Sequence, residues 1–252
     1  MRSVFELSGR AAVVTGVGGP RGIGFAVATT LAALGADLVV SGGSARVHDR
    51  AAELPGAVAV VGDLTRPETA GELVETAVSR FGRLDIAVNC AGMTSVSSPA
   101  PEAGRVEDMS FETWRAALAR NLDSAFLFAK AVLPALTSRL VMVASLTGPT
   151  MAMRGEVAYG AAKAGVVGLI RGLALDAARS GVTVNAVAPG WIATDSQTAA
   201  EHAQGLRTPL GRSGTAAEVA SLIAYLCTPS ASYVTGQCLV VDGGNSIAEE
   251  RA

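Results

Sequence analysis

The sequence predicts an α/β fold in which one parallel sheet carries helices on both faces. Short apolar runs alternate with helical patterns along all 252 residues, a glycine-rich turn follows the first apolar run, and no repeat or linker divides the chain. Alternating strands and helices form a doubly wound parallel sheet, because each crossover packs a helix on one face. We expect one domain, residues 1–252, with seven strands in the order 3-2-1-4-5-6-7.

The individual elements follow from two kinds of pattern. Short apolar runs bounded by polar residues or glycine indicate buried strands, whereas longer stretches with apolar residues at helical spacing indicate helices. The expected strands include 11–14, 37–41, 57–61, 84–88, 140–144 and 182–188. The expected helices run from the glycine-rich turn to 35 and over 65–80, 110–133, 158–178 and 216–226, with a loop over 94–108 and a short lid over 195–208.

Composition argues against several classes of function. The net charge is −2 and no block of like charges occurs, so neither nucleic acid nor an anionic membrane is an expected partner. Half of the residues are hydrophobic, yet no uninterrupted apolar run approaches the roughly 20 residues of a transmembrane helix. The first residues lack the apolar segment of a signal peptide. We expect a cytoplasmic protein whose partners are small molecules and copies of itself.

The sulfur and imidazole side chains argue against disulfides and metals. The three cysteines are widely spaced and form no C-x-x-C motif, which indicates reduced thiols. With only His48 and His202 present and no zinc-like cluster, we expect no catalytic metal.

Three polar residues predict an acid–base centre. Ser145 follows a strand-like run, so it would lie at the carboxyl end of that strand, where open α/β sheets bind ligands. Tyr159 and Lys163 are four residues apart in a helical pattern, which brings them to one helix face. A cation roughly 4–5 Å from the phenolate, at an effective dielectric of about 20, would lower the tyrosine pKa by on the order of three units. The Ser145 hydroxyl could hold a carbonyl or alcohol oxygen against the phenol. Serines at strand ends and Tyr-x-x-x-Lys pairs on solvated helices are also common, so other motifs must decide.

A second motif predicts a dinucleotide site. Residues 11–14 lead into Thr15-Gly16-Val17-Gly18-Gly19-Pro20-Arg21-Gly22-Ile23-Gly24 and then into an Ala-rich helical pattern. Glycines let backbone N–H groups approach a pyrophosphate, and the positive end of the helix dipole stabilises it. Glycine-rich turns also form for conformational reasons alone. The strand before this turn and the helix after it favour the dinucleotide interpretation.

Together with Tyr159-x-x-x-Lys163, this loop resembles that of the short-chain dehydrogenase/reductase family, in its single-domain branch with a Rossmann-type sheet. Residues 239–244 resemble the family's last strand, which in relatives helps to form tetramers, so a homotetramer or homodimer is expected.

Two departures stand out: five residues rather than three separate Gly16 from Gly22, and Tyr159 follows Ser145 by fourteen residues rather than thirteen. The resemblance implies hydride transfer between a nicotinamide and a ketone or secondary alcohol, with a catalytic set of Asn121, Ser145, Tyr159 and Lys163. In the family, the helix asparagine stabilises a local helix distortion and holds a water near the lysine.

The resemblance also implies which residues contact the cofactor. They come from the glycine loop, from the ends of successive strands and from the helix that carries the tyrosine. The set comprises Gly16, Arg21, Gly22, Ile23, Gly24, Ser41, Ser44, Arg46, Asp63, Leu64, Asn89, Ala91, Gly92, Tyr159, Lys163, Pro189, Gly190, Ile192 and Thr194.

The residues after the second strand favour NADP(H) over NAD(H). An acid there would bind the adenosine ribose and repel a 2′-phosphate, but Ser41 to Arg46 contains none. In the family, a basic residue at the position of Arg21 is associated with NADP(H). The alternative is that Arg21 and Arg46 are solvated surface charges, and Gly43 stands where relatives carry an arginine.

The resemblance also implies that Asp63 hydrogen-bonds the adenine amino group, as the aspartate at this position does in the family. Thr65-Arg66-Pro67-Glu68 has the spacing of a capping box with an early proline. We expect Thr65 to cap the following helix, which would leave Asp63 free for the cofactor.

The substrate is open at this level. Members that resemble this chain are often 3-oxoacyl-[acyl-carrier-protein] reductases, which makes that activity the alternative to reduction of small ketones. An acidic carrier protein needs basic groups near the pocket, and Leu136 to Arg139 and Leu173 to Asp176 supply few. A cofactor-binding scaffold without catalysis is the alternative from another class. Candidate pocket residues are Leu146, Met151, Met153, Arg154 and Trp191, where the methionines could also be core fillers and Trp191 either pocket wall or core.

Overall fold

The computed structural model describes residues 4–93 and 104–249. Its centre is a seven-stranded sheet in the order β3-β2-β1-β4-β5-β6-β7 in which every neighbouring pair is parallel. The fold class and the strand order predicted from the sequence are therefore confirmed. The strands are β1 (Ala11–Val14), β2 (Asp37–Gly42), β3 (Val58–Val61), β4 (Leu84–Asn89), β5 (Leu136–Val143), β6 (Thr183–Pro189) and β7 (Cys238–Val241).

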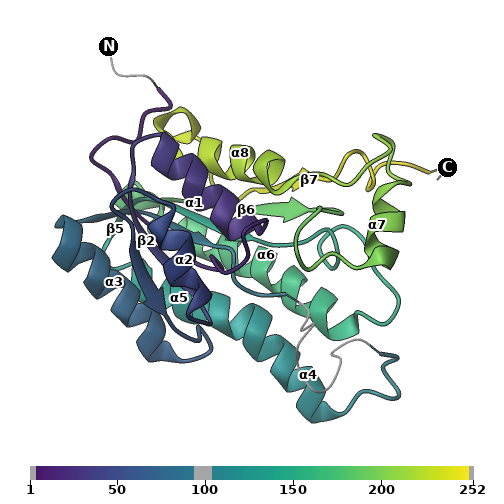
Figure 1. Ribbon diagram of the computed structural model, residues 1–252. Coiled ribbons are helices and arrows are strands. Elements are labelled where there is room, and N and C mark those ends of the chain that lie inside the picture. Colours follow the sequence, from purple (N-terminus) through teal and green to yellow (C-terminus); the bar gives the residue numbers. More distant parts are fainter. Residues whose placement is uncertain (1–3, 94–103, 250–252) are drawn as a thin grey trace.

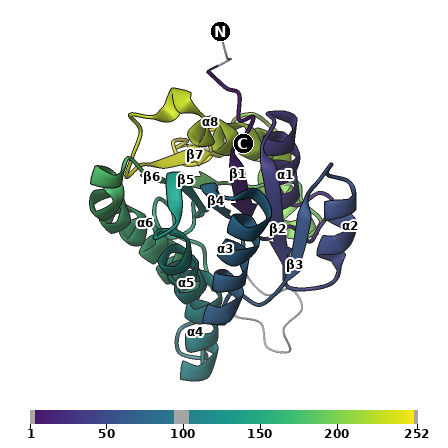
Figure 2. The same ribbon diagram turned by 90° about the vertical axis from the view of Figure 1, so that its left-hand side faces the viewer.

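Helices cover both faces of this sheet (Figures 1 and 2). Alternate strand residues point to opposite faces, so Val13 lies in one core while Ala12 and Val14 lie in the other. Residues from α1 (Ile23–Ala33), α2 (Arg46–Ala52) and α8 (Ala216–Cys227) complete one core. The other contains residues from α3 (Pro67–Phe81), α5 (Ser124–Val132) and α6 (Val157–Ala177), and α4 (Phe111–Leu118) packs on α6.

The stretch 110–133, predicted as one helix, is interrupted. Helix α4 ends at Leu118, a π-helical turn η1 (Ala119–Asp123) follows, and α5 continues from Ser124. Asn121 lies in this turn, where its Nδ2 donates to the carbonyl of Ala117 at 3.2 Å. Single π turns inside helices are often found at functional sites. The local distortion that the resemblance implied at Asn121 is present.

Other predicted boundaries also need correction. Strand β5 begins at Leu136, four residues before the predicted start, and its pairing with β4 is irregular there. Two seven-residue helices were not expected: α2 follows the turn after β2, and α7 (Ala199–Gly205) lies within the predicted lid, beyond the carboxyl end of β6 (Figure 1). The predicted loop at 94–108 falls largely outside the described residues.

Packing in the core explains why helix α6 is long and apolar. By length and composition, Val157–Ser180, which adds the turn η2 (Ala178–Ser180), could cross a membrane, with a mean hydropathy of 1.2. Its residues Val166, Ile170 and Ala174, however, lie in the core beside the sheet. The apolar character of α6 is thus accounted for by packing.

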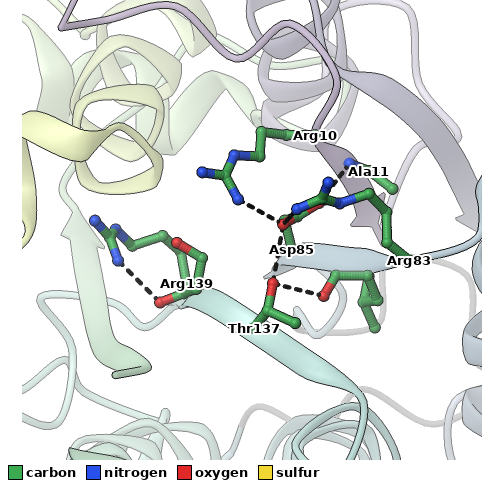
Figure 3. A network of polar contacts seen from close by, with 8 residues as sticks. Arg10, Ala11, Arg83, Asp85, Thr137 and Arg139 are labelled. Carbon is green, nitrogen blue, oxygen red and sulfur yellow. Dashed lines mark hydrogen bonds and ion pairs between the residues drawn. The ribbon is translucent and has the colours of Figure 1, made fainter. Parts of the chain in front are cut away.

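A buried carboxylate joins three strands at the amino edge of the sheet (Figure 3). Asp85 on β4 accepts hydrogen bonds from Arg10 (2.8 Å), from Arg83 (2.6 Å), from the Thr137 hydroxyl on β5 (2.9 Å) and from the backbone N–H of Ala11 on β1 (3.0 Å). Burial alone raises the pKa of Asp85, but these donors outweigh burial and lower that pKa to about 2. Asp85 is therefore charged at neutral pH and clamps the starts of β1, β4 and β5.

Candidate active site

The glycine loop forms a backbone cradle at the start of α1. Gly16 has a φ of +74°, and a Cβ on it would lie 2.7 Å from the carbonyl carbon of Cys90. A Cβ on Gly24 would lie 2.5 Å from the carbonyl oxygen of Gly16. Gly22 precedes the first residue of α1, and no acid occurs in the first helical turn. Because only glycine fits and the helix terminus faces the loop, these residues fit a dinucleotide pyrophosphate.

The loop is tied to the end of β4 by buried polar contacts. The Thr15 hydroxyl donates to Asn89 Oδ1 at 2.6 Å and accepts from the N–H groups of Cys90 and Ala91. Asn89 Oδ1 also accepts from the Ala91 N–H at 3.1 Å. Asn89 is almost fully buried. Its side chain therefore fixes the loop and the end of β4 relative to each other.

The two extra residues of the glycine loop form an outward turn. The Gly22 N–H donates to the carbonyl of Gly19 at 3.1 Å, which leaves Pro20 and Arg21 exposed. Arg21 does not extend toward the end of β2. Its Nε binds Asp195 Oδ1 at 2.6 Å and its backbone N–H binds Oδ2 at 3.0 Å. The enlarged loop thus contacts the segment after β6.

The residues at the end of β2 and in the turn after it differ in their exposure to solvent. The Ser41 side chain is buried, so its contact with the cofactor stays a prediction. Ser44 and Arg46 are exposed, and Arg46 Nε donates to the Ser44 hydroxyl at 3.3 Å. Hydrogen bonds from Arg21 and the nearby charge of Arg46 lower the pKa of Asp195. Both arginines therefore lie around this carboxylate.

The expected capping role of Thr65 is wrong. Helix α3 begins at Pro67 without a side-chain cap. The Thr65 N–H and hydroxyl both donate to Asp63 Oδ1 at 2.9 Å instead, so Asp63 forms a local turn and is not entirely free. Asp63 is exposed beside the buried Leu64, with its second oxygen available to a ligand.

The lysine of the predicted centre is buried between two strand ends. Lys163 Nζ donates to the carbonyl of Val143 at 3.2 Å and of Gly92 at 3.4 Å, and lies 5.6 Å from the ring centroid of Tyr159. Burial lowers the pKa of Lys163 to about 8. The carbonyls of Val143, at the end of β5, and of Gly92, beyond the end of β4, therefore hold its ammonium beside the tyrosine.

The pKa of Tyr159 departs from the sequence expectation. Burial raises this pKa, a hydrogen bond with Ser145 lowers it, and the charges of Glu156 and Glu201 raise it further. The net shift is upward, opposite to the lowering expected from Lys163. The reason is tertiary: the phenol is buried near two carboxylates, while the carbonyls of Val143 and Gly92 engage the ammonium.

Asn121 lies next to Gly92 with one atom aimed into a closed space. Its Oδ1 is buried and accepts no hydrogen bond from the described residues. A Cβ on Gly92, whose φ is +106°, would lie 3.1 Å from that oxygen. The π turn therefore presents a buried acceptor at the strand end that also binds Lys163.

The end of β6 completes the edge of the sheet. The backbone of Leu146 binds the carbonyl of Pro189 at 3.1 Å, and a Cβ on Gly190 would lie 2.8 Å from the Asp242 side chain. Ile192 and Thr194 follow and line a cavity of about 360 Å³. Two residues that were expected to contact the cofactor therefore also line the cavity expected to hold the substrate.

The cavity contains some of the predicted pocket residues and several others. Met153 and Trp191 line it, whereas Leu146 is buried, Met151 receives the Asn245 amide, and Arg154 is exposed; none of these three lines the cavity. The remaining lining among the described residues was missed from the sequence and comprises Met93, Glu156, Ser196, Gln197, Thr198, Ala200 and Glu201. One signal was available for part of it, because Thr198-Ala199-Ala200-Glu201 has capping-box spacing.

The assembled site offers a phenol, a hydroxyl and an ammonium beside a cavity and a glycine cradle. Such a set can move a proton to or from an oxygen held by Ser145. Within residues 4–93 and 104–249, no group of three or more His, Cys, Asp and Glu side chains could hold a metal ion.

Known proteins share this sequence and arrangement. Residues 16–246 match the family model described as enoyl-(acyl carrier protein) reductase. The 3-oxoacyl-[acyl-carrier-protein] reductase FabG of Vibrio cholerae is 37% identical over 251 residues, covering 95% of this chain and 98% of that protein.

Solved structures agree with the sequence relatives. A short-chain dehydrogenase/reductase from Serratia marcescens superposes with a TM-score of 0.86 at 29% identity, covering 95% of this chain and 99% of its own. A 7 alpha-hydroxysteroid dehydrogenase complexed with NADH and 7-oxo glycochenodeoxycholic acid gives a TM-score of 0.87 at 30% identity, with 98% of both chains covered. The chain belongs to the short-chain dehydrogenase/reductase family and is an NAD(P)-dependent oxidoreductase that acts on CH–OH and C=O groups.

Proposed function

We propose that this chain interconverts a small ketone and its secondary alcohol with NADP(H), and that Tyr159 is the general acid or base. One observation carries the proposal: Tyr159 lies at the carboxyl edge of the sheet. Its hydroxyl is hydrogen-bonded to Ser145, and Lys163 lies beside its ring. The glycine cradle lies at the same edge, and the cavity of about 360 Å³ adjoins it. A phenol, a cofactor cradle and a substrate cavity are what a carbonyl reductase requires.

In the direction of reduction, the bound nicotinamide supplies the hydride that reaches the carbonyl carbon. The Tyr159 hydroxyl donates its proton to the carbonyl oxygen. Ser145 Oγ accepts from the Thr147 N–H at 3.1 Å, so its own hydrogen can be donated to the same oxygen. The Lys163 ammonium stabilises the tyrosinate that remains. Oxidation of the alcohol reverses the proton transfers.

Asn121 supports the return of the proton in this proposal. Its buried Oδ1 has no partner among the described residues and lies by Gly92, whose carbonyl binds Lys163. A buried acceptor of this kind is ordinarily satisfied by water. A water at this place would connect the lysine to solvent, as the family resemblance implies.

We propose that NADP(H) is preferred over NAD(H). The end of β2 carries no acid, and Arg46 is exposed there beside Ser44. The charge of Arg46 also reaches Asp195, the partner of Arg21, so two guanidinium groups lie on this side of the cradle. A 2′-phosphate at the end of β2 would meet the exposed Arg46 guanidinium and no acid within residues 41–46.

The variant Arg46→Ala tests this preference. We expect its affinity for NADPH to fall about tenfold, which is about 1.4 kcal/mol, with NADH affinity changed less than about twofold. Calorimetric titration or tryptophan fluorescence measures both constants. Arg179→Ala, an exposed arginine in the turn after α6, is the matched control and should leave both constants unchanged. Equal loss for the two cofactors, or tighter binding of NADH by the parent protein, would contradict the preference.

A carrier-protein substrate is the second candidate, favoured by the name of the Vibrio cholerae relative. The candidate basic residue Arg139 is buried and donates to the carbonyl of Thr228, so it cannot meet an acidic partner. The cavity is lined by Glu156 and Glu201 and, among the described residues, by no basic side chain. These features favour a free small molecule over an acyl chain on an acidic carrier.

Comparison of substrates decides between these activities. We expect NADPH oxidation with small ketones and little with an acyl-carrier-protein thioester at equal concentration. An enoyl thioester tests the activity that the family model's description mentions. Turnover of the carrier-bound 3-oxoacyl substrate alone would reverse the assignment, and tight NADPH binding with no turnover of any carbonyl or alcohol would indicate a scaffold.

We propose that the chain is cytoplasmic and forms a homotetramer or homodimer. Strand β7 is an edge of the sheet, where Val240 is partly exposed and Tyr233 nearby is fully exposed. An exposed edge strand with apolar side chains favours pairing with a second copy. Light scattering after size-exclusion chromatography would give the mass of the assembly.

A further inference from the structure

The enlarged glycine loop makes a contact across the carboxyl edge of the sheet. Arg21 lies in the loop after β1, and Asp195 lies in the segment after β6. Strands β4 and β5 lie between these two strands, so the ends of β1 and β6 are three strand spacings, or roughly 14 Å, apart. The contact between Arg21 and Asp195 therefore connects two parts of the site that are well separated in the sheet.

Two hydrogen bonds form this contact, which we call the clasp, and each uses a different carboxylate oxygen. Arg21 Nε donates to Asp195 Oδ1 at 2.6 Å, and the Arg21 backbone N–H donates to Oδ2 at 3.0 Å. Glycine at position 19 permits this approach, because a Cβ there would lie 3.1 Å from Oδ2. These bonds lower the pKa of Asp195, so its carboxylate is charged at neutral pH. Since one donor is a backbone N–H, the carboxylate holds the loop itself and not only a side chain.

Each end of the clasp adjoins a residue predicted to contact the cofactor. Arg21 directly precedes Gly22 of the glycine cradle, and Asp195 directly follows Thr194. A dinucleotide that contacts both Gly22 and Thr194 would lie between the two parts that the clasp joins. Entry and release of such a ligand would then require the clasp to open.

The clasp also adjoins the substrate cavity. Thr194 and Ser196, on either side of Asp195, both line the cavity, and their hydroxyls are hydrogen-bonded to each other at 3.0 Å. The next lining residue, Gln197, donates from Nε2 to the Ser213 hydroxyl at 2.9 Å. Asp195 thus ties a short stretch of the cavity wall to the glycine loop.

We propose that the clasp of Arg21 and Asp195 is a gate that slows both entry and release of the dinucleotide and positions the cavity wall at Thr194 and Ser196. Asp195 is a positioning residue in this proposal, because it acts through Arg21 rather than by contact with the cofactor. The proposal requires that the chain binds a nicotinamide dinucleotide. It depends neither on the preference for NADP(H) nor on the identity of the carbonyl substrate.

Stopped-flow fluorescence of NADPH measures the two rates. Association is followed after mixing with the protein, and release is followed by displacing bound NADPH with excess NADP⁺. Because exposed ion pairs are weak, we expect Asp195→Ala to raise both rate constants only about fivefold. Kd should stay within about twofold of the wild-type value, because a gate affects both directions equally. NADH, displaced by NAD⁺, should show the same acceleration, because the clasp does not bind the 2′-phosphate.

Two further variants assign the effect to the clasp. Asp176→Ala, which removes an exposed acid from α6, is the matched control and should leave both rates unchanged. In an Arg21→Ala background, Asp195→Ala should change either rate by less than about twofold, because most of the contact is already lost. The backbone N–H of residue 21 remains in that background and accounts for the residual effect.

Hydrogen exchange of the protein without cofactor tests the positioning of the cavity wall. Backbone amides in 19–22 and 194–198 should exchange faster in Asp195→Ala than in the wild type, whereas amides of the central strands should not change. Unchanged exchange in both segments would overturn the positioning role.

The kinetic outcomes distinguish a gate from a direct contact. Unchanged rate constants in Asp195→Ala would overturn the gate. Faster release with a matching loss of affinity would also overturn it, because Asp195 would then belong to the binding surface. Faster release in Arg21→Ala alone would assign Arg21 to the cofactor directly and overturn the clasp. Failure to reduce any ketone would contradict the proposed function without affecting these binding rates.

Discussion

Tyr159→Phe is expected to lower kcat for ketone reduction by about 10³-fold while the affinity for NADPH changes less than about twofold. The hydroxyl is the only atom group removed, and general acid–base catalysis typically contributes 10²–10⁴-fold. The ring remains to pack beside Lys163, whose ammonium lies 5.6 Å from its centroid. Steady-state kinetics together with calorimetric titration of NADPH separate the two effects.

A matched tyrosine controls for the substitution itself. Tyr233 is fully exposed near β7, so Tyr233→Phe should retain wild-type turnover. Turnover of Tyr159→Phe close to that of the wild type would end the proposed mechanism. Loss of NADPH binding together with turnover would show that the variant damages the cofactor site, and then Ser145→Ala becomes the test of oxygen positioning.

The raised pKa of Tyr159 gives this prediction a pH signature. Burial, with the charges of Glu156 and Glu201, favours the protonated phenol, which is the form needed for reduction. Reduction should therefore persist into alkaline solution and fall as the phenol loses its proton. Alcohol oxidation needs the phenolate and should increase over the same range. Neither titration should be present in the residual activity of Tyr159→Phe.

The sequence predicts the parts of this protein that local pattern determines. Valine-rich runs give the buried strands, and the spacing of Tyr159 and Lys163 places both on one helix face. The glycine loop is equally readable, because Gly16 and Gly24 sit where a Cβ has no space. These features depend on residues close together in the chain.

The features that sequence analysis missed depend on distant residues or on competition between local contacts. Arg21 pairs with Asp195, 174 residues away, which no local pattern reports. Thr65 had two possible partners, and the turn with Asp63 was favoured over the helix cap. The pKa of Tyr159 was misjudged because burial of the phenol by the tertiary fold raises it, and the charges of Glu156 and Glu201 raise it further.

The predicted lid contains a helix, α7, that the sequence could have predicted. The polar composition of 195–208 indicated a loop, but Thr198 and Glu201 have capping-box spacing and begin α7. A helix of seven residues is too short for its apolar periodicity to be visible. Here the capping-box spacing of Thr198 and Glu201 would have predicted the start of α7, although the same spacing at Thr65 did not produce a cap.

Asp85→Asn is expected to lower the free energy of unfolding by about 3 kcal/mol without altering the geometry of the active site, which lies at the opposite edge of the sheet. The carboxylate is fully buried and receives Arg10, Arg83 and Thr137. An asparagine amide would turn two hydrogens toward guanidinium donors and leave their charge uncompensated. Urea unfolding followed by circular dichroism measures the loss. Asp37→Asn, at the exposed start of β2, is the matched control and should change stability by less than about 0.5 kcal/mol.

The pH dependence of that difference identifies the charge as its cause. The pKa of Asp85 is lowered from 3.8 to about 2 in the folded protein, so its charged form stabilises the fold above pH 3.8, by about 2 kcal/mol. This contribution is lost as the pH falls from about 4 toward 2, because protons then bind the unfolded chain first. The gap in melting temperature between the wild type and Asp85→Asn should therefore narrow between pH 5 and pH 3. A gap that stays constant over this range would show that shape, rather than charge, makes Asp85 stabilising.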